Sequence, residues 1–323
     1  MKKFKVLHIS PTPLVDAPRK INDTLNLYSK YDSSIFIFKD YPGKLKGKFS
    51  TNVLIYDTSK ELTLSLLADA DIIHIHNFLT IEQENIVLRY SKSDVIFVYQ
   101  AHSPLREGPL FVNYADNSRI DYDKKCVIAQ YHPRLYQDYV LVPNIILQIP
   151  TISLINDADT PKVLFSPTHK RVGGRWNDKA SSELDVALNA LEALGLIELV
   201  VAEGYTPHEL YQLRKRCHIS IDEIVTGAYH QVSLESMCAG NVTINNADIF
   251  SKLMLKTIIG KDVKVPFLNM NEFTIKEKLL SIVKDKKLIR KFQQDSYNFH
   301  IQYLQPEILI EHYINIYTEV LKK

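Results

Sequence analysis

Short apolar runs rich in β-branched residues alternate with stretches of helical periodicity along almost the whole chain. This alternation is typical of βα units, in which helices connect the strands of a parallel sheet. The runs that we expect to form strands fall into two series, at 5–9, 34–38, 52–56, 71–76, 94–100 and 139–142, and then at 162–165, 198–202, 218–222 and 241–244. The pattern therefore predicts an α/β protein built on parallel sheets.

The length of 323 residues exceeds a single core of roughly 100 to 200 residues, so we expect two domains. The polar stretch NDADTP at 156–161 predicts the linker, which gives Rossmann-like domains at 1–155 and 156–305. An amphipathic helix at 306–323 is expected to pack back on the first domain. The segment 104–134, rich in Asp, Asn, Tyr and Pro, predicts irregular structure with short elements.

Composition excludes several classes of protein. Hydrophobic residues make up 46% and charged residues 24%, which excludes a disordered chain. The formal charge of +2 gives no global signature of nucleic acid or anionic lipid binding, although local basic patches stay open. No apolar run approaches the roughly 20 residues of a spanning helix. Three scattered cysteines argue against disulfides and structural zinc, and predict a reducing cytoplasm.

A polar segment, GAYHQVSLESMCAGNVTINN, lies between the expected strands at 218–222 and 241–244. Ligands of such folds bind at strand carboxyl ends and helix N-termini. The loop of Gly227, Ala228, Tyr229 and His230 offers backbone N–H groups to a phosphate. Glu235 is expected near the crevice-facing side of the next helix, where its carboxylate could accept hydrogen bonds from a ribose diol. A glutamate on a helix is, with about equal odds, only part of a solvated face.

The same segment resembles the donor-nucleotide site of GT-B glycosyltransferases, specifically the large retaining family 4 (glycosyl transferases group 1). Its run G-x-Y-x-x-x-x-x-E-x-M-x-x-G matches at Gly227, Tyr229, Glu235, Met237 and Gly240. The usual pattern has two glutamates eight positions apart, and Gly227 stands where the first would be. The resemblance implies a GT-B fold, with two Rossmann-like parallel-sheet domains facing a central cleft.

The resemblance also implies roles for residues elsewhere in the second half. VLFSPTHK at 163–170 is similar to the family strand whose end contacts the donor, so the resemblance implies that Thr168 binds the donor. Glu203, at the end of a later strand, is assigned to the same site. Lys179 and Arg175, with Arg171 as the alternative, would clamp the diphosphate. Fixed cations would stabilise the departing nucleoside diphosphate without a metal, but basic residues in such a Gly-containing loop are also common as exposed turns.

Histidines end the strands expected in the first half. VIFVYQAHSP resembles the family strand that ends in a histidine facing the reaction centre, a role the resemblance implies for His102. His74 and His76 alternate on a strand, so both point to one face, where packing or hydrogen bonding is the expected use. Because no third ligand stands at a supporting spacing, we predict no metal site.

Together these features predict a cytoplasmic retaining glycosyltransferase with a nucleotide diphosphate sugar as co-substrate and no cofactor. The expected acceptor is a hydroxyl of a bacterial surface glycan or lipid-linked saccharide, with peripheral membrane contact through the basic N-terminus. One alternative is a phage-type enzyme acting on a hydroxymethylated DNA base, whose phosphates the run KLKGK at 44–48 would contact. Another is an inactive GT-B-like protein that binds a nucleotide sugar or glycan.

Overall fold

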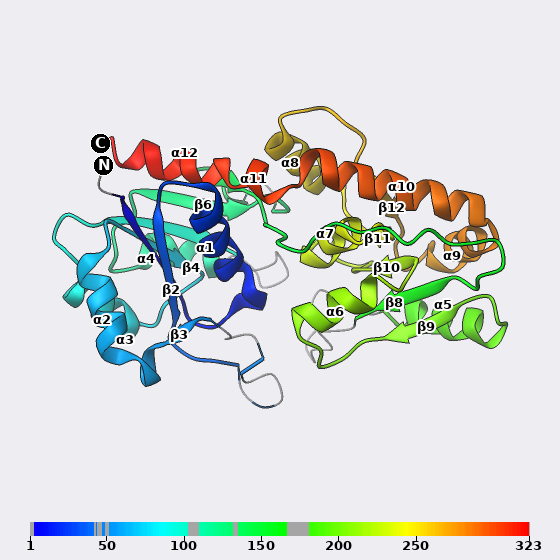
Figure 1. Cartoon of the computed structure of the whole chain (residues 1–323), viewed down its shortest axis with the longest axis horizontal. Coiled ribbons are helices and arrows are strands. Elements are labelled where there is room, and N and C mark those ends of the chain that lie inside the picture. The colour runs from blue at the N-terminus through cyan, green and yellow to red at the C-terminus, as the bar shows by residue number, and fades with distance from the viewer. Residues whose placement is uncertain are drawn as a thin grey trace. The chain divides into compact units, whose positions relative to one another are not determined.

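The computed structural model describes residues 3–41, 43, 47–48, 52–102, 110–131, 135–166 and 181–322, with the side chains of 110–112 excepted. The chain forms two compact units, Met1–Leu147 together with Pro306–Lys323 (unit 1), and Gln148–Gln305 (unit 2) (Figure 1). The boundary therefore lies before residue 148 and not after 155. The reason is packing: Ile155 is buried in the core of unit 2, and the Tyr211 hydroxyl donates to the Ile149 carbonyl.

Unit 1 is built on a seven-stranded sheet in the order β3-β2-β1-β4-β5-β6-β7, with all its pairs parallel. The order reverses at β1, because β2 lies on one side of it and β4 on the other. The strands are β1 Lys5–Ser10, β2 Asp32–Ile37, β3 Leu54–Ile55, β4 Ile72–His76, β5 Ile96–Ala101, β6 Lys124–Ile128 and β7 Val140–Val142.

Helices connect these strands, as the sequence predicted. They are the short 3-10 turns η1 Leu14–Asp16 and η3 Tyr56–Thr58, and the helices α1 Ala17–Tyr28, α2 Lys60–Asp69, α3 Ile81–Tyr90, α4 Leu110–Asn117, α11 Pro306–Leu309 and α12 Glu311–Val320. The C-terminal helices, red in Figure 1, belong to unit 1. Tyr313 and Tyr317 of α12 are fully buried, and the Tyr313 hydroxyl donates to the Pro143 carbonyl at 2.8 Å.

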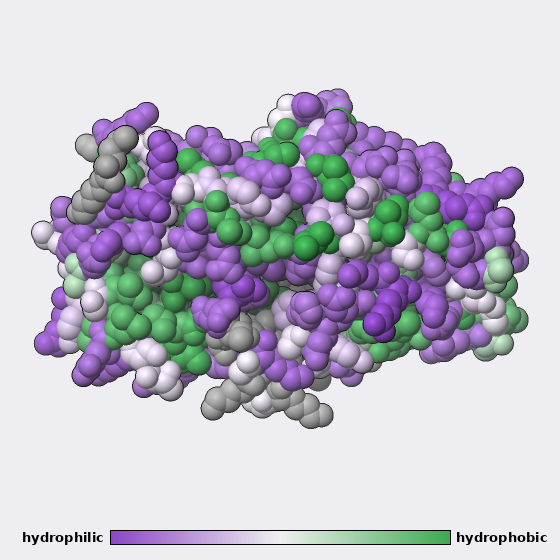
Figure 2. All heavy atoms as spheres, in the orientation of Figure 1, coloured by the Kyte–Doolittle hydropathy of each residue, from purple (hydrophilic) through white to green (hydrophobic). Residues whose placement is uncertain are grey.

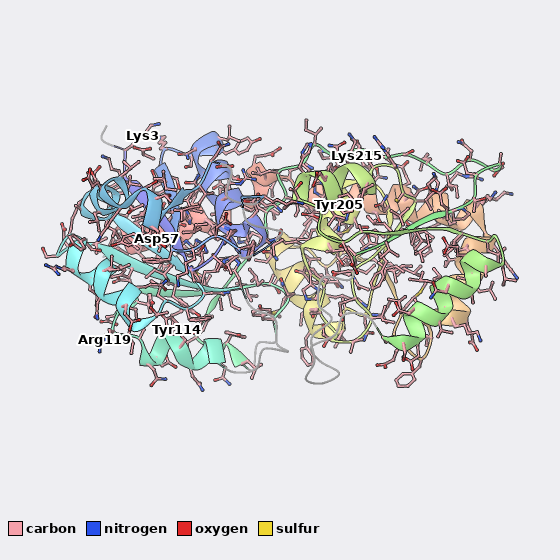
Figure 3. The ribbon with its side chains drawn as sticks, turned by 90° about the horizontal axis from the view of Figure 1, so that it is seen from below. Lys3, Asp57, Tyr114, Arg119, Tyr205 and Lys215 are labelled. Carbon is pink, nitrogen blue, oxygen red and sulfur yellow. The ribbon has the colours of Figure 1, made fainter. Side chains whose placement is uncertain are left out.

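The segment 104–134 contains short elements, as the sequence predicted, namely α4 and β6. The Tyr114 hydroxyl on α4 donates to the buried carboxylate of Glu84 on α3 at 2.6 Å, and the Ser118 hydroxyl donates to the same oxygen at 2.7 Å. Figure 3 shows Tyr114 on α4 with Arg119 nearby. These contacts join residues about thirty positions apart, so periodicity could not reveal them.

Unit 2 carries a five-stranded parallel sheet in the order β12-β11-β10-β8-β9. Here the order reverses between β8 and β10. Its strands are β8 Lys162–Phe165, β9 Glu198–Val201, β10 Ile219–Ile221, β11 Val242–Asn245 and β12 Phe267–Asn269. Its helices are α5 Ser182–Ala193, α6 Pro207–Arg214, α7 Gln231–Cys238, α8 Ile249–Ile259, α9 Ile275–Lys284 and α10 Lys286–Tyr303. The two units therefore have the predicted Rossmann-like, parallel-sheet architecture.

The sequence has no apolar run long enough to span a membrane, and the surface and the helices can be compared with that expectation. In Figure 2, apolar side chains form separate green patches among hydrophilic ones on the face that is seen. Among the helices of the described residues, none is long and apolar enough to cross a membrane.

A close backbone contact in unit 2 gives the first prediction. Gly240 has a φ of +62°, and a Cβ there would lie 2.7 Å from Ile152 Cγ1 and 3.0 Å from Ile152 Cα. Gly195 has a similar φ of +67° but open space around it. We expect Gly195→Ala to cost about 1 kcal/mol for the left-handed backbone, and Gly240→Ala about 1–3 kcal/mol more for the clash. Urea unfolding of both variants measures the difference, and equal losses would contradict the contact.

Candidate functional site

Two acidic residues lie at the switch point of the unit 2 sheet. Asp222 and Glu223 directly follow β10, which neighbours β8 where the strand order reverses. Both side chains are buried. In open parallel sheets the crevice beyond the carboxyl ends at such a point is where ligands bind. The topology therefore makes this edge the candidate site of unit 2.

Asp222 orders the start of α7. Its carboxylate accepts the backbone N–H of His230 at 2.6 Å and the hydroxyl of Ser233 at 2.8 Å, and His230 Nδ1 lies 3.2 Å from its other oxygen. The Asn245 amide donates to the Ser233 hydroxyl at 2.8 Å. Because β10, α7 and the end of β11 share this network, the helix N-terminus is held in place before any ligand arrives.

Glu223 is only half satisfied. Its Oε2 accepts the backbone N–H groups of Val225 at 2.9 Å and Thr226 at 2.6 Å. Its Oε1 is buried and has no hydrogen-bond partner within the described part of the chain. A buried carboxylate oxygen without a donor costs free energy, so this atom is suited to accept a hydrogen bond from a ligand. The sequence signal for Glu223 was the acidic pair at the end of the expected strand at 218–222, and our sequence analysis missed it.

The predicted phosphate loop, residues 227–230, is held by contacts with residues outside it. Gly227 has a φ of +81°, and its carbonyl accepts the Asp248 N–H at 2.8 Å and the Ser251 hydroxyl at 3.0 Å. Ala228 and Tyr229 are buried, with the Tyr229 ring 5.4 Å from that of Phe267. The side chains of Ala228 and Tyr229 thus belong to the core, and their backbone is what they could offer a ligand.

Glu235 corrects the expectation of a crevice-facing carboxylate. It lies in α7 with a side chain only 6% exposed, and Arg214 Nη1, from the end of α6, is 2.9 Å from its Oε2. The guanidinium is fully buried, and its Nε and Nη2 have no partner among the residues described. The sequence missed this pairing because it joins two helices through residues 21 positions apart. Its contact with a ribose stays a prediction.

The remaining predicted donor residues are less defined. Glu203 follows β9 and is exposed, and no described contact brings it to Asp222 or Glu223. Thr168, Arg175 and Lys179 lie outside the described residues, as do Arg171 and most of the basic run at 44–48. Their roles stay predictions.

Histidines gather at the switch point of unit 1. In the parallel pairing of β1 with β4, His8 lies opposite His74, and His76 follows two residues later on the same face. All three side chains are fully buried. His8 Nδ1 lies 2.8 Å from His76 Nε2, and His74 Nδ1 lies 2.7 Å from the Tyr317 hydroxyl.

His102 directly follows β5, where the sequence analysis placed a strand-end histidine. Its backbone N–H donates to Asn77 Oδ1 at 2.7 Å, and its Nε2 lies 2.8 Å from His76 Nδ1. Asn77, with a φ of +59°, bonds through its own N–H to the Gln100 carbonyl. The end of β4 therefore holds both the backbone and the ring of His102, whose catalytic role stays a prediction.

His8 is a third histidine that the spacing of His74 and His76 did not show, because it comes from another strand. It corrects the statement that no third ligand supports them. One nitrogen from each of the three rings lies within 4.8 Å of the others, and neutral imidazoles are zinc ligands. Both ring nitrogens of His76 already make hydrogen bonds, so the three could hold a metal ion only if the contact of His76 with His8 or with His102 opened.

Burial keeps these rings uncharged. It lowers the pKa of His8 to about 3 and that of His102 to about 3, and it lowers the pKa of His74 and His76 well below their ordinary value. Repulsion from neighbouring imidazoles lowers the pKa of His8, His74 and His76 further. At neutral pH each ring therefore carries one N–H and one lone pair.

Comparison with known proteins gives likenesses of structure only. No family model and no curated protein sequence matches the chain. An α-glucosyltransferase in complex with UDP and a 13-mer DNA matches with a TM-score of 0.64 and 10% identity, over 98% of this chain and 100% of that one. A glycosyltransferase from Rickettsia africae matches at 0.61 and 12%, over 100% of both chains. HepE of Anabaena, in complex with UDP-glucose, matches at 0.60 and 13%, over 97% and 99%.

The chain has the GT-B fold. The match to these GT-B structures spans both units, so each candidate site belongs to one Rossmann-like unit of that fold.

The buried histidines of this GT-B chain predict acid sensitivity. A ring whose folded pKa is depressed binds its proton mainly after unfolding, so stability is present above pH 6.5 and is lost as pH falls toward 3. His8, His74 and His76 should each contribute about 1.4 kcal/mol per pH unit below pH 6.5. We expect urea unfolding between pH 7 and 5 to show this slope, reduced by one ring's share in His74→Phe. His208→Gln, at an exposed position, should leave it unchanged; an unchanged slope in His74→Phe would contradict the assignment.

The ion pair inside unit 2 gives a further prediction. Glu235→Gln leaves the buried Arg214 charge uncompensated, so we expect a loss of about 3–5 kcal/mol in the free energy of unfolding. The double variant Arg214→Met/Glu235→Gln should recover much of that loss. Glu198→Gln breaks an exposed pair with Lys162 and should change stability little. Urea unfolding measures all three, and a Glu235→Gln protein as stable as Glu198→Gln would show that the pair is not a buried one in solution.

Proposed function

We propose that this protein is a glycosyltransferase that transfers a sugar from a nucleotide diphosphate sugar to a hydroxyl group of an acceptor. The observation that carries the proposal is Glu223, whose buried Oε1 lacks a partner among the described residues at the switch point of unit 2. A hydroxyl of a ribose or sugar is a donor that this oxygen would accept. The GT-B fold supports the proposal, because two of the similar structures hold UDP or UDP-glucose.

The site supplies positions for the rest of a nucleotide sugar. Asp222 fixes the N-terminus of α7, whose N–H groups and dipole favour a phosphate. Lys179 and Arg175 would add the fixed positive charge that stabilises the departing diphosphate. In the proposed retaining mechanism, a phosphate oxygen of the donor accepts the acceptor's proton while the protein mainly positions the reacting groups. Neither a metal ion nor a cofactor has a step in this mechanism.

The proposed acceptor is a surface glycan or a lipid-linked saccharide. A second candidate is DNA, favoured by the similar α-glucosyltransferase whose structure contains a DNA 13-mer. The formal charge of +2 is low for a duplex-binding protein. The non-enzymatic alternative is an inactive GT-B-like protein that only binds its ligand. Such a protein would release no free sugar or UDP from a donor.

Glu223→Gln tests the proposal at the atom that carries it. The amide oxygen can keep accepting from Val225 and Thr226, while an NH₂ group replaces the free Oε1, so a donor hydroxyl loses its acceptor. We expect the dissociation constant of UDP or a UDP-sugar, measured by calorimetry, to rise about tenfold or more, as for a hydrogen bond to a charged group. Thermal unfolding without ligand should change little.

The matched control is Glu277→Gln, on the exposed side of α9, which should bind like the unchanged protein. The same proteins are then assayed for UDP release with a glycan acceptor, a hydroxymethylated DNA duplex and water. Release with one acceptor identifies its class. Tight binding without release by any of them supports the inactive alternative, and equal affinity of Glu223→Gln and Glu277→Gln removes Glu223 from the site.

A further inference from the structure

We propose that His76 and His8 are positioning residues that fix the tautomer of His102, holding its single ring proton on Nδ1. The three rings form a hydrogen-bonded chain that we call the histidine relay, running from the end of β5 through the end of β4 into the middle of β1. The tautomer follows from the relay alone. The use of His102 toward a ligand rests on the proposed function.

His76 uses both of its ring nitrogens. Its Nδ1 lies 2.8 Å from His102 Nε2, and its Nε2 lies 2.8 Å from His8 Nδ1. A neutral imidazole has one N–H donor and one lone-pair acceptor, so each contact needs a proton from one side only. The choice at one end of the relay therefore determines the protonated nitrogen in all three rings.

Two arrangements satisfy both contacts. In the first, His8 Nδ1 and His76 Nδ1 carry the protons, His102 Nε2 accepts, and His8 Nε2 is a bare lone pair. In the second, all protons are on Nε2 atoms, and His8 Nε2–H points into the core. His8 Nε2 is buried without a partner in the described structure. An orphaned buried N–H is rarer and costlier than an orphaned acceptor, so the first arrangement is favoured.

Packing prevents the rings from rotating, so ring rotation does not offer a third arrangement of the protons. The His76 ring stacks on that of His74 with 4.2 Å between centroids, and on that of His8 with 5.1 Å. His74 stays outside the relay because its Nδ1 bonds to the Tyr317 hydroxyl. Asn77 holds the backbone of His102 from the same side. Of the three relay residues, His8 and His76 are buried, and His102 is partly exposed.

The consequence is a specific chemistry at the end of β5. Since His102 Nε2 accepts from His76, the nitrogen left for a ligand is Nδ1, which presents an uncharged N–H. Such a group donates to a hydroxyl, carbonyl or phosphate oxygen and has no lone pair with which to act as a base. His102 would therefore orient an oxygen of the bound sugar or acceptor and leave proton abstraction to another group.

The direct test is NMR of the full-length protein with ¹⁵N-labelled histidine at neutral pH. The two ring nitrogens have distinct ¹⁵N shifts when protonated and bare, so each tautomer can be determined without substrate. We expect Nδ1–H at His8, His76 and His102. An Nε2–H at His102, averaged tautomers, or stoichiometric zinc bound by the rings would overturn the proposal. Because no ligand is involved, failure here is distinct from failure of the proposed function.

Variants of His76 then test the coupling. His76→Asn keeps an N–H donor near the place of Nδ1, whereas His76→Leu removes it and leaves His102 Nε2 without its donor. We expect His76→Leu to release the tautomer of His102 from Nδ1–H and to lower kcat of the proposed transfer roughly three- to tenfold with little change in the donor KM, as for one neutral hydrogen bond. His76→Asn should restore both.

The matched control is Tyr317→Phe, which removes a buried hydrogen bond from the neighbouring His74 but not from the relay. It should leave the tautomer of His102 unchanged. If His76→Leu and His76→Asn behave alike, or if Tyr317→Phe shifts the His102 tautomer as His76→Leu does, the relay does not set the state of His102.

Discussion

The pairing of parallel strands at the two switch points determines which polar side chains meet in this protein. In unit 1 the register of β1 with β4 places His8 opposite His74, and in unit 2 β10 pairs with β8 so that Asp222 and Glu223 emerge where the order reverses. A shift of one residue in either register would move the side chains of the shifted strand to the other face of the sheet. The chemistry of both candidate sites therefore depends on backbone hydrogen bonds made elsewhere in the strands.

Hydrogen bonding among the buried acidic side chains distinguishes those that stabilise the fold from the one that could contact a ligand. Asp222 accepts two short hydrogen bonds and a nearby imidazole, so its charge stabilises the loop before α7. Glu235 is likewise occupied by Arg214, although the sequence favoured it as a ligand contact. Glu223 differs, because one of its buried oxygens, Oε1, has no hydrogen-bond partner among the described residues. Since an unmet buried acceptor is costly, its retention is easier to understand if a ligand meets it.

The sequence predicted the parallel sheets, most strand positions and the strand-end location of His102, because alternation and local turn residues encode these features. It could not predict the ion pair of Arg214 with Glu235 or the contact of His8 with His76, which join residues 21 and 68 positions apart. Local patterns also misplaced the unit boundary, since Ile155 precedes the polar linker yet packs in the core of unit 2. Each miss reflects tertiary packing that leaves no periodic trace in the chain.

The two candidate sites differ in the charge of the side chains that are described at each. The unit 2 edge combines the N-terminus of α7 with one available carboxylate oxygen, Glu223 Oε1, which fits a phosphate beside a hydroxyl group. The described histidines of unit 1 are kept neutral by burial, which lowers their pKa, so these rings offer hydrogen bonds without a charge. An uncharged ring has little attraction for a diphosphate but can still orient a sugar hydroxyl. On the proposed function, the diphosphate is therefore expected at unit 2, and what His102 would offer a ligand is the direction of a single N–H.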